Sequence, residues 1–237
     1  MKTSLIAGLA LAGSLFCTAG VSHAGIMLDG TRLVLAAPAK EASILVKNKA
    51  PTDIMIQSWV EAGSQNGDVP FAITPALSRL SGEKQQMLRI LYQGQGLPTD
   101  RESVFWVNVQ EVPQKAKDEN TLQIAVRQRI KLFYRPVGLP GKPEGAAAQL
   151  SWRVVNESGA PRLEARNGSA YHVSLSSVTL RSGGRDYSAK VEMIPPSATR
   201  RFELQGWRGQ PDAGAKVQFE SINDFGATES HSSPVVD

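Results

Sequence analysis

A series of short β-prone segments, separated by turn residues, is the feature that most constrains how this chain folds. Within roughly 110 residues of the first half, seven such segments follow one another at the spacing typical of an immunoglobulin-like sandwich. They cover Arg32–Leu35, Ala42–Lys47, Ile54–Val60, Phe71–Thr74, Met87–Tyr92, Val104–Val109 and Leu122–Tyr134. Since no stretch carries the 3.6-residue apolar period of an amphipathic helix, the pattern predicts an all-β fold.

The composition changes directly after these segments. Arg135–Pro143 holds three prolines and two glycines, and a strand cannot continue through such a stretch. Further β-prone segments then follow at Leu150–Val155, Arg162–Arg166, Tyr171–Leu180, Arg185–Val191, Thr199–Leu204 and Lys216–Ile222. We therefore expect two immunoglobulin-like β-sandwich domains joined at an elbow: residues 25–137, a hinge at 138–142, and residues 143–237.

The first 24 residues have the form of a secretory signal peptide. Lys2 supplies a positive charge, Leu5–Phe16 is an apolar run, and Ser22-His23-Ala24 offers small residues at the positions that a signal peptidase reads. The apolar run is short for a membrane span, so we expect export without membrane insertion. Cys17 follows a phenylalanine rather than a small residue, which argues against a lipid anchor.

Several kinds of chemistry are disfavoured by what the mature chain lacks. Cys17 is the only cysteine, so no thiol, disulfide or cysteine metal site remains after cleavage. The two remaining histidines are His172, at a strand start, and His231, in a polar tail that we expect to be exposed. No serine-hydrolase elbow, zinc-peptidase motif or phosphate loop occurs. We therefore expect no enzyme, no cofactor and no metal site.

A binding protein is the better interpretation, and two kinds remain open. The 26 Lys and Arg against 22 Asp and Glu are scattered rather than clustered, so we expect no nucleic-acid partner. A secreted adhesin or carbohydrate-binding module is one alternative. It would need an exposed aromatic platform, for which the candidates are Trp59, Trp106, Trp152 and Trp207.

The segment Thr121–Pro136 has two features that suit a binding edge. Leu122, Ile124 and Val126 alternate with Gln, Ala and Arg residues, which is the period of a β-strand. Lys131 then stands alone between two large aliphatic residues. Lys131 and the distant Arg32 would hold one carboxylate by charge-assisted hydrogen bonds if they met in space. Otherwise they are two ordinary surface cations.

Several segments, taken together, resemble one protein family. Leu97–Pro113 (LPTDRESVFWVNVQEVP) resembles the signature segment of the periplasmic chaperones of the chaperone–usher pilus pathway. Ile130–Pro136 resembles the end of the last strand of their first domain, and Ile222–Gly226 resembles a segment of their second domain. Thr74–Leu80, with Leu88–Ile90, resembles a further stretch. The resemblance runs in order from Arg32 to about Gly226.

That resemblance implies a boomerang-shaped, non-enzymatic periplasmic chaperone. It would stabilise pilin subunits, which lack the last strand of their own sandwich, by lending them a donor strand. Leu122, Ile124 and Val126 would fill the subunit's apolar pockets. Arg32 and Lys131 would grip the subunit's C-terminal carboxylate. An outer-membrane usher would be the second partner, and self-association through the donor strand remains open.

The resemblance also assigns a charge cluster and a branch of the family. Glu102, Arg135 and Asp224 match positions of the family's interdomain charge cluster, which holds the elbow angle. The short, cysteine-free connection Gln114–Asn120 resembles the branch with a short F1–G1 loop, associated with rod-like pili. One departure is Ala76, where the family often has a second proline, so whether this turn contains a cis peptide is open.

The alternation of the donor strand raises a geometric difficulty. Lys131 is an odd number of residues from Val126, so a regular strand points the two side chains to opposite faces. Either the strand bulges or twists strongly between Arg127 and Ile130, or Lys131 reaches the carboxylate from the cleft side. A regular strand with Lys131 buried inside the first domain would contradict the anchoring role.

Overall fold

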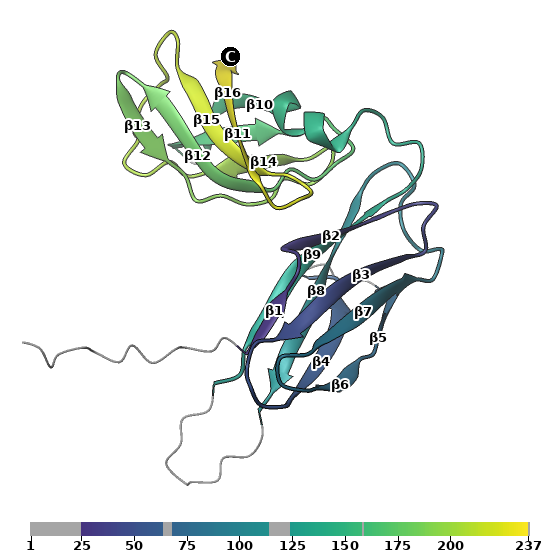
Figure 1. The fold of residues 1–237 in the computed structure, drawn as a ribbon. Coiled ribbons are helices and arrows are strands. Elements are labelled where there is room, and N and C mark those ends of the chain that lie inside the picture. Colours follow the sequence, from purple (N-terminus) through teal and green to yellow (C-terminus); the bar gives the residue numbers. More distant parts are fainter. Residues whose placement is uncertain (1–24, 64–67, 114–123, 158, 237) are drawn as a thin grey trace, which may run out of the picture.

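Two β-sheet domains meet at an elbow in the computed structural model of the chain (Figure 1). It describes residues 25–63, 68–113, 124–157 and 159–236. The expected signal peptide, the Gln114–Asn120 connection and Leu122 lie outside these ranges. Within them, the helical residues form two short 3-10 turns, η1 (Pro143–Gly145) and η2 (Ala147–Gln149), which follow the linker. No helix in the described ranges is long and apolar enough to cross a bilayer.

The first domain consists of two facing sheets. The four-stranded sheet has the order β1 (Ile26–Leu28), β3 (Glu41–Asn48), β7 (Gln85–Tyr92) and β5 (Phe71–Thr74). The five-stranded sheet has the order β2 (Arg32–Ala36), β9 (Arg127–Arg135), β8 (Ser103–Val112), β4 (Ile54–Glu61) and β6 (Leu77–Leu80). Since side chains alternate across a strand, every second residue of each sheet enters the core. The fully buried members include Val46, Leu88, Ile90, Val107 and Leu132.

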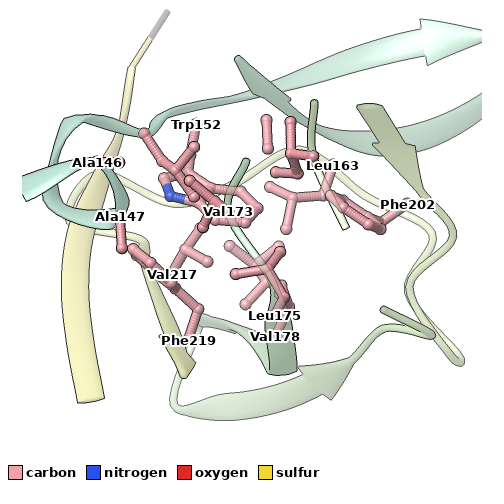
Figure 2. Close-up of a cluster of buried hydrophobic side chains, with 14 of the residues drawn as sticks. Ala146, Ala147, Trp152, Leu163, Val173, Leu175, Val178, Phe202, Val217 and Phe219 are labelled. Carbon is pink, nitrogen blue, oxygen red and sulfur yellow. The ribbon is translucent and has the colours of Figure 1, made fainter. Parts of the chain in front are cut away.

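In the second domain, seven strands pair in one continuous order, and this sheet folds over to enclose the core. The order is β13 (Arg185–Ser188), β12 (Leu175–Ser182), β15 (Lys216–Ile222), β16 (Thr228–Val236), β10 (Ser151–Glu157), β11 (Ala160–Arg166) and β14 (Thr199–Phe202). β16 joins the two halves, because it pairs antiparallel with β15 and, through Val235 opposite Trp152, parallel with β10. Trp152 is fully buried and packs with Phe202 and Phe219 (Figure 2).

The predicted all-β class and the pair of immunoglobulin-like domains are confirmed, while individual strands differ in detail. The predicted bounds of Phe71–Thr74 and Lys216–Ile222 match β5 and β15. The short strands β1 and β6 and the C-terminal β16 were not expected. His231 was wrongly placed in an exposed tail, because it lies in β16 with its Nε2 2.8 Å from the Ser221 Oγ.

The turn before β6 contains the cis peptide that the sequence left open. The bond between Thr74 and Pro75 is cis, as is the bond between Ala37 and Pro38. The cis bond therefore precedes the first proline position of the turn, and Ala76 takes no part in it.

Candidate functional site

The first half of β9 is paired with a strand on one side, whereas its second half is paired with strands on both sides. β8 pairs with β9 from Gln110 opposite Arg127 to Ser103 opposite Tyr134. In the described chain β2 pairs with β9 over a shorter range, from Arg32 opposite Lys131 to Ala36 opposite Arg135. The first half of β9, together with the residues from Ile124 that lead into it, thus lies beyond the end of β2. Such an edge offers backbone groups to a further strand.

The aliphatic face of this segment continues the core face of the first domain. Ile130 and Leu132 point into the core, and Val126 packs partly against it. Ile124 is two residues further out and is 74% exposed. The alternation that fills the core therefore runs past the end of the sandwich, where aliphatic side chains have no core left to cover them. Leu122, assigned to the same face, lies outside the described residues.

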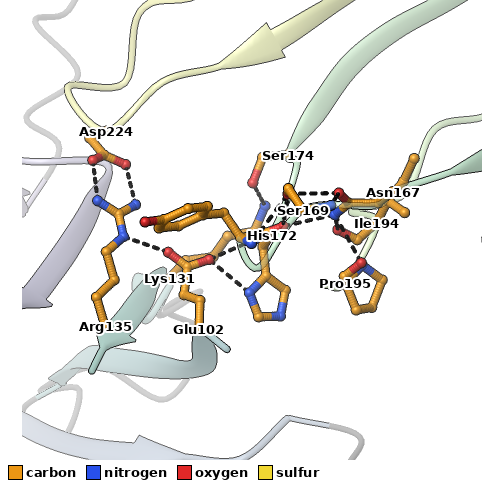
Figure 3. Close-up of polar contacts among 11 residues, drawn as sticks. Glu102, Lys131, Arg135, Asn167, Ser169, His172, Ser174, Ile194, Pro195 and Asp224 are labelled. Carbon is orange, nitrogen blue, oxygen red and sulfur yellow. Dashed lines mark hydrogen bonds and ion pairs between the residues drawn. The ribbon is translucent and has the colours of Figure 1, made fainter. Parts of the chain in front are cut away.

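The bulge considered between Arg127 and Ile130 is absent from the structure. Strands β8 and β9 pair one to one from Arg127 to Tyr134 without a shift of register. Lys131 instead points away from the core and into the cleft, where its Nζ donates a 2.9 Å hydrogen bond to the Oγ of Ser174 in the second domain (Figure 3). The second of the two expected geometries, a lysine that faces the cleft, is the one observed.

Arg32 and Lys131 lie side by side on neighbouring strands. The Arg32 Nη1 donates to the Ile222 carbonyl at 2.8 Å, whereas its buried Nε has no hydrogen-bond partner within the described residues. Burial, and secondarily the charge of Arg32, lower the pKa of Lys131 from its ordinary 10.5 to about 8. Burial also lowers the pKa of Arg32, against the opposing fields of Asp224 and Glu102. Neither cation forms an ion pair in the part of the chain that is described, so the pair can accept an anion.

A small cavity opens beside this cation pair at the elbow. Its volume is about 100 Å³, and its walls include Arg32, Phe133, Val173, Ser174 and Phe225. Phe225, at the tip of the β15–β16 turn, is 95% exposed. The cavity is also lined by Arg135 and by the carboxylates of Glu102, Glu144, Asp224 and Glu229, so charges of both signs and apolar side chains meet there beside Arg32.

The predicted charge cluster connects the two domains (Figure 3). The Arg135 guanidinium donates from Nε to the Glu102 Oε1 at 2.7 Å, and from Nη1 and Nη2 to the two Asp224 oxygens at 2.5 and 2.7 Å. Burial disfavours the charge of Arg135, but the hydrogen bond to Asp224 and the field of Glu102 outweigh it and raise the pKa of Arg135. Glu102 is only 2% exposed, and removing a partner from such a buried carboxylate is strongly destabilising.

His172 completes the cluster from the second domain and was not predicted. Its backbone N–H and its Nδ1 both lie 2.8 Å from the Glu102 Oε2. The Glu102 backbone N–H in turn donates to the Ala170 carbonyl at 2.9 Å. Alternation alone had suggested an ordinary strand residue, because the partner of His172 is 70 residues away and leaves no local signal.

The loop that carries His172 and Ser174 is shaped by a buried asparagine. The Asn167 side chain is fully buried, and its Nδ2 donates to the carbonyls of Tyr171, Ile194 and Pro195 (Figure 3). The Tyr171 hydroxyl donates to the Gly141 carbonyl in the linker. The second domain thus presents a loop of defined shape to Glu102 and Lys131.

The tryptophans do not form the open platform that a carbohydrate-binding module would need. Trp152 and Trp207 are buried in the second domain. Trp59 and Trp106 lie on the outer face of the first domain's five-stranded sheet, where the Arg127 and Arg129 guanidinium carbons lie 4.9 and 3.8 Å from their respective ring centroids. In the described ranges, no three His, Cys, Asp or Glu residues gather as a metal site would require.

Two consecutive parts of the chain match models of one family. Residues 25–140 match the N-terminal domain, and residues 145–233 the C-terminal domain, of the PapD pili assembly chaperones. The chain is 38% identical over 216 residues to the probable fimbrial chaperone YadV of Escherichia coli K12, covering 86% of this chain and 87% of the relative. It is 39% identical over 206 residues to the chaperone protein LpfB of Salmonella typhimurium, covering 85% of each.

Solved structures agree with these matches. A crystal structure of the YadV chaperone has a TM-score of 0.78 at 37% identity, and the match covers 88% of this chain and 98% of that one. A structure of the Salmonella enterica SafA pilin in complex with the SafB chaperone has a TM-score of 0.73 at 31% identity, with 87% and 93% covered.

Proposed function

The chain belongs to the PapD family of pilus-assembly chaperones, and we propose that it stabilises pilin subunits by lending them the exposed edge of β9. The proposal rests mainly on one observation: β9 extends past the end of β2, and Ile124, three residues before β9 begins, is exposed. A subunit that lacks one strand would pair with this edge, as in strand-addition complexes. Among the solved structures, the SafB chaperone is seen bound to the SafA pilin.

The aliphatic face of the segment would supply affinity. Ile124 is 74% exposed, and full burial of such a side chain contributes about 1.5–3 kcal/mol. Val126, already partly covered by its own domain, would contribute less. Leu122 takes the same role from its place in the alternation.

Arg32 and Lys131 would bind the subunit's C-terminal carboxylate. Two neighbouring half-buried cations are unfavourable without a counter-charge, and the lowered pKa of Lys131 reflects that cost. The unpartnered Arg32 Nε and the Lys131 ammonium would each donate to one carboxylate. Ser174, which holds the ammonium in the free protein, would then exchange its place with the carboxylate or share the ammonium with it.

The Glu102–Arg135–Asp224 cluster would set the elbow angle. Arg135 bonds to both domains at once, and His172 ties the second domain to Glu102. A fixed angle keeps the cleft at a width that brings Ser174 to Lys131. The cluster would therefore keep the carboxylate site assembled before a subunit arrives.

The proposed role has a place and a second partner. Residues 1–24 would direct the chain to the periplasm, and the bound subunit would pass to an outer-membrane usher. The role is not enzymatic. Both histidines of the mature chain are engaged, His172 by Glu102 and His231 by Ser221.

Co-expression with a pilin subunit tests this proposal. The wild-type chain and the exposed-lysine control Lys49→Met should both protect the subunit from degradation. Lys131→Met and Arg32→Ala should lose the subunit while the chaperone itself remains folded, as checked by its circular dichroism spectrum. Normal subunit recovery with both cleft variants would contradict the carboxylate anchor. Normal recovery with Ile124→Asp would contradict strand lending.

A further inference from the structure

The outer face of the five-stranded sheet carries a connected group of side chains that subunit binding alone does not explain. The group, here called the outer-face clamp, spans the three neighbouring strands β4, β8 and β9. Its members are Trp59, Glu61, Trp106, Asn108, Arg127 and Arg129. All of them lie on the side of the sheet opposite the core, because they share the odd positions of β9 and the positions paired with them.

Arg127 is held at three points. Its Nε and Nη2 donate to the Asn108 Oδ1 at 2.9 and 2.6 Å. Nη2 also lies 3.3 Å from a carboxylate oxygen of Glu61, and the guanidinium stacks over the ring of Trp59. Asn108 is fully buried, so this contact ties the first residue of β9 to a fixed point of β8.

Arg129 is held in the same way, one step along the strand. Its Nε donates to the Glu61 Oε1 at 2.6 Å, and its guanidinium carbon lies 3.8 Å from the centroid of Trp106. The Trp106 ring in turn approaches the Lys131 ammonium at 5.9 Å. Gly63 closes over Trp106: with φ at +71°, an added Cβ there would lie 2.7 Å from the Trp106 Nε1. Arg127 and Arg129 thus contact side chains of both β4 and β8, and Lys131 approaches Trp106 of β8.

Glu61 is the shared element of the clamp. Burial opposes its ionisation, but the hydrogen bonds from Arg129 and Trp59 and the charges of both arginines outweigh burial and lower the pKa of Glu61. Without this carboxylate, two like charges would stand on the same face of β9 with no counter-charge between them. Like charges close together on one face of a sheet destabilise it, and we expect that repulsion to loosen the regular pairing of β9.

The clamp lies where β9 leaves the support of β2. Val126 and Lys131 are five residues apart, and a strand rises about 3.3 Å per residue, so the aliphatic contacts and the cation pair are separated by roughly 17 Å. A single bulged residue would shorten that distance by about one step and turn the aliphatic side chains to the other face. The regular register observed here avoids both.

We propose that the outer-face clamp sets the spacing between the carboxylate-binding cations and the subunit-facing aliphatic side chains of β9. Its residues are positioning residues that need not touch the subunit. This inference rests on the proposed function, since the spacing matters only if one subunit uses both contacts. The clamp itself, however, is a property of the free protein and can be tested there.

The first test is amide hydrogen exchange in the free protein. Because the Glu111 N–H donates to the Val126 carbonyl, the alternation of antiparallel pairing directs the Gln128 and Ile130 amides to β8 as well. In Glu61→Gln these two amides should exchange roughly tenfold faster. The matched control is Glu41→Gln, which breaks the Glu41–Arg89 pair on the other sheet of the same domain and should leave them unchanged. Unchanged exchange in Glu61→Gln and in Trp106→Leu would overturn the clamp.

The second test is a double-mutant cycle with a peptide that copies the C-terminal strand of a pilin subunit. If the clamp maintains the spacing, Lys131→Met should weaken binding at least about threefold less in the Glu61→Gln background than in the wild type, because both changes strike the same linkage. Additive effects would mean that Glu61 only stabilises the domain, and would overturn the inference. If the wild type does not bind the peptide at all, the proposed function fails, while the exchange result still decides whether the clamp exists.

Discussion

Replacing Lys131 by methionine should stabilise the free chaperone and impair it at the same time. Methionine keeps the length of the side chain and removes the charge. The drop in the pKa of Lys131 from 10.5 to about 8 corresponds to about 3 kcal/mol at about 1.4 kcal/mol per pH unit. Solvent screening of its exposed part reduces this to about 2 kcal/mol. The lost hydrogen bond to Ser174 takes back about 1 kcal/mol, so the variant should gain about 1 kcal/mol of unfolding free energy at pH 7.

The sign of the pH dependence follows from the same pKa. The folded-state pKa of Lys131 lies below the unfolded-state value, so its destabilising effect is full below pH 8 and fades as the pH rises to about 10.5. Urea unfolding, followed by tryptophan fluorescence at pH 7 and at pH 10, should show the advantage of the variant shrinking at the higher pH. Binding of the subunit should fall about 10- to 150-fold, the value of one hydrogen bond to a charged group. A variant that is less stable at pH 7, or that binds like the wild type, would refute the reasoning.

Three further outcomes are expected. Affinity for a peptide with a free C-terminal carboxylate should fall by up to about tenfold per pH unit above pH 8, until the loss expected for Lys131→Met is reached, because the carboxylate binds the protonated form of Lys131 more tightly. An amidated peptide should show no such fall, and equal profiles would contradict the anchor. Asp224→Asn removes the carboxylate charge and one of the two oxygens that accept from Arg135, which should lower the unfolding free energy by about 2 kcal/mol in urea. It should also widen the range of elbow angles seen by small-angle scattering, and an unchanged scattering profile would count against the cluster's role. Ile124→Ala should change unfolding free energy by less than about 0.5 kcal/mol yet weaken subunit binding about tenfold, so unaltered binding would exclude this side chain from the contact.

Much of the fold can be predicted from the alternation of apolar and polar residues, and the strands that this pattern misses are missed for physical reasons. Phe71–Thr74 and Lys216–Ile222 were predicted with the observed bounds, because buried and exposed side chains alternate along both. β16 was missed because TESHSSPVV carries mostly polar side chains at its inward positions. Its place depends on pairing with β15 and β10, which only the assembled domain provides.

The candidate site shows the same division. The family resemblance brought Glu102, Arg135 and Asp224 forward, and the structure brings them together. The alternation of side chains correctly predicted that Lys131 lies on the face opposite Val126. It could not predict that Lys131 contacts Ser174 of the second domain. The bulge, one of the two geometries considered, is absent, and the side chains that we propose hold β9 in register come from other strands. Contacts between strands far apart in sequence decided each of these points.

The most direct test of strand lending is backbone hydrogen exchange on β9 in the presence of a subunit. The pairing of Glu111 with Val126 turns the amides of Arg127 and Arg129 away from β8, toward the edge that β2 does not reach. If that edge pairs with the subunit, these two amides should exchange at least about a hundredfold more slowly in the complex than in the free chaperone. Unchanged exchange at both amides in a complex that has formed would show that the subunit binds elsewhere.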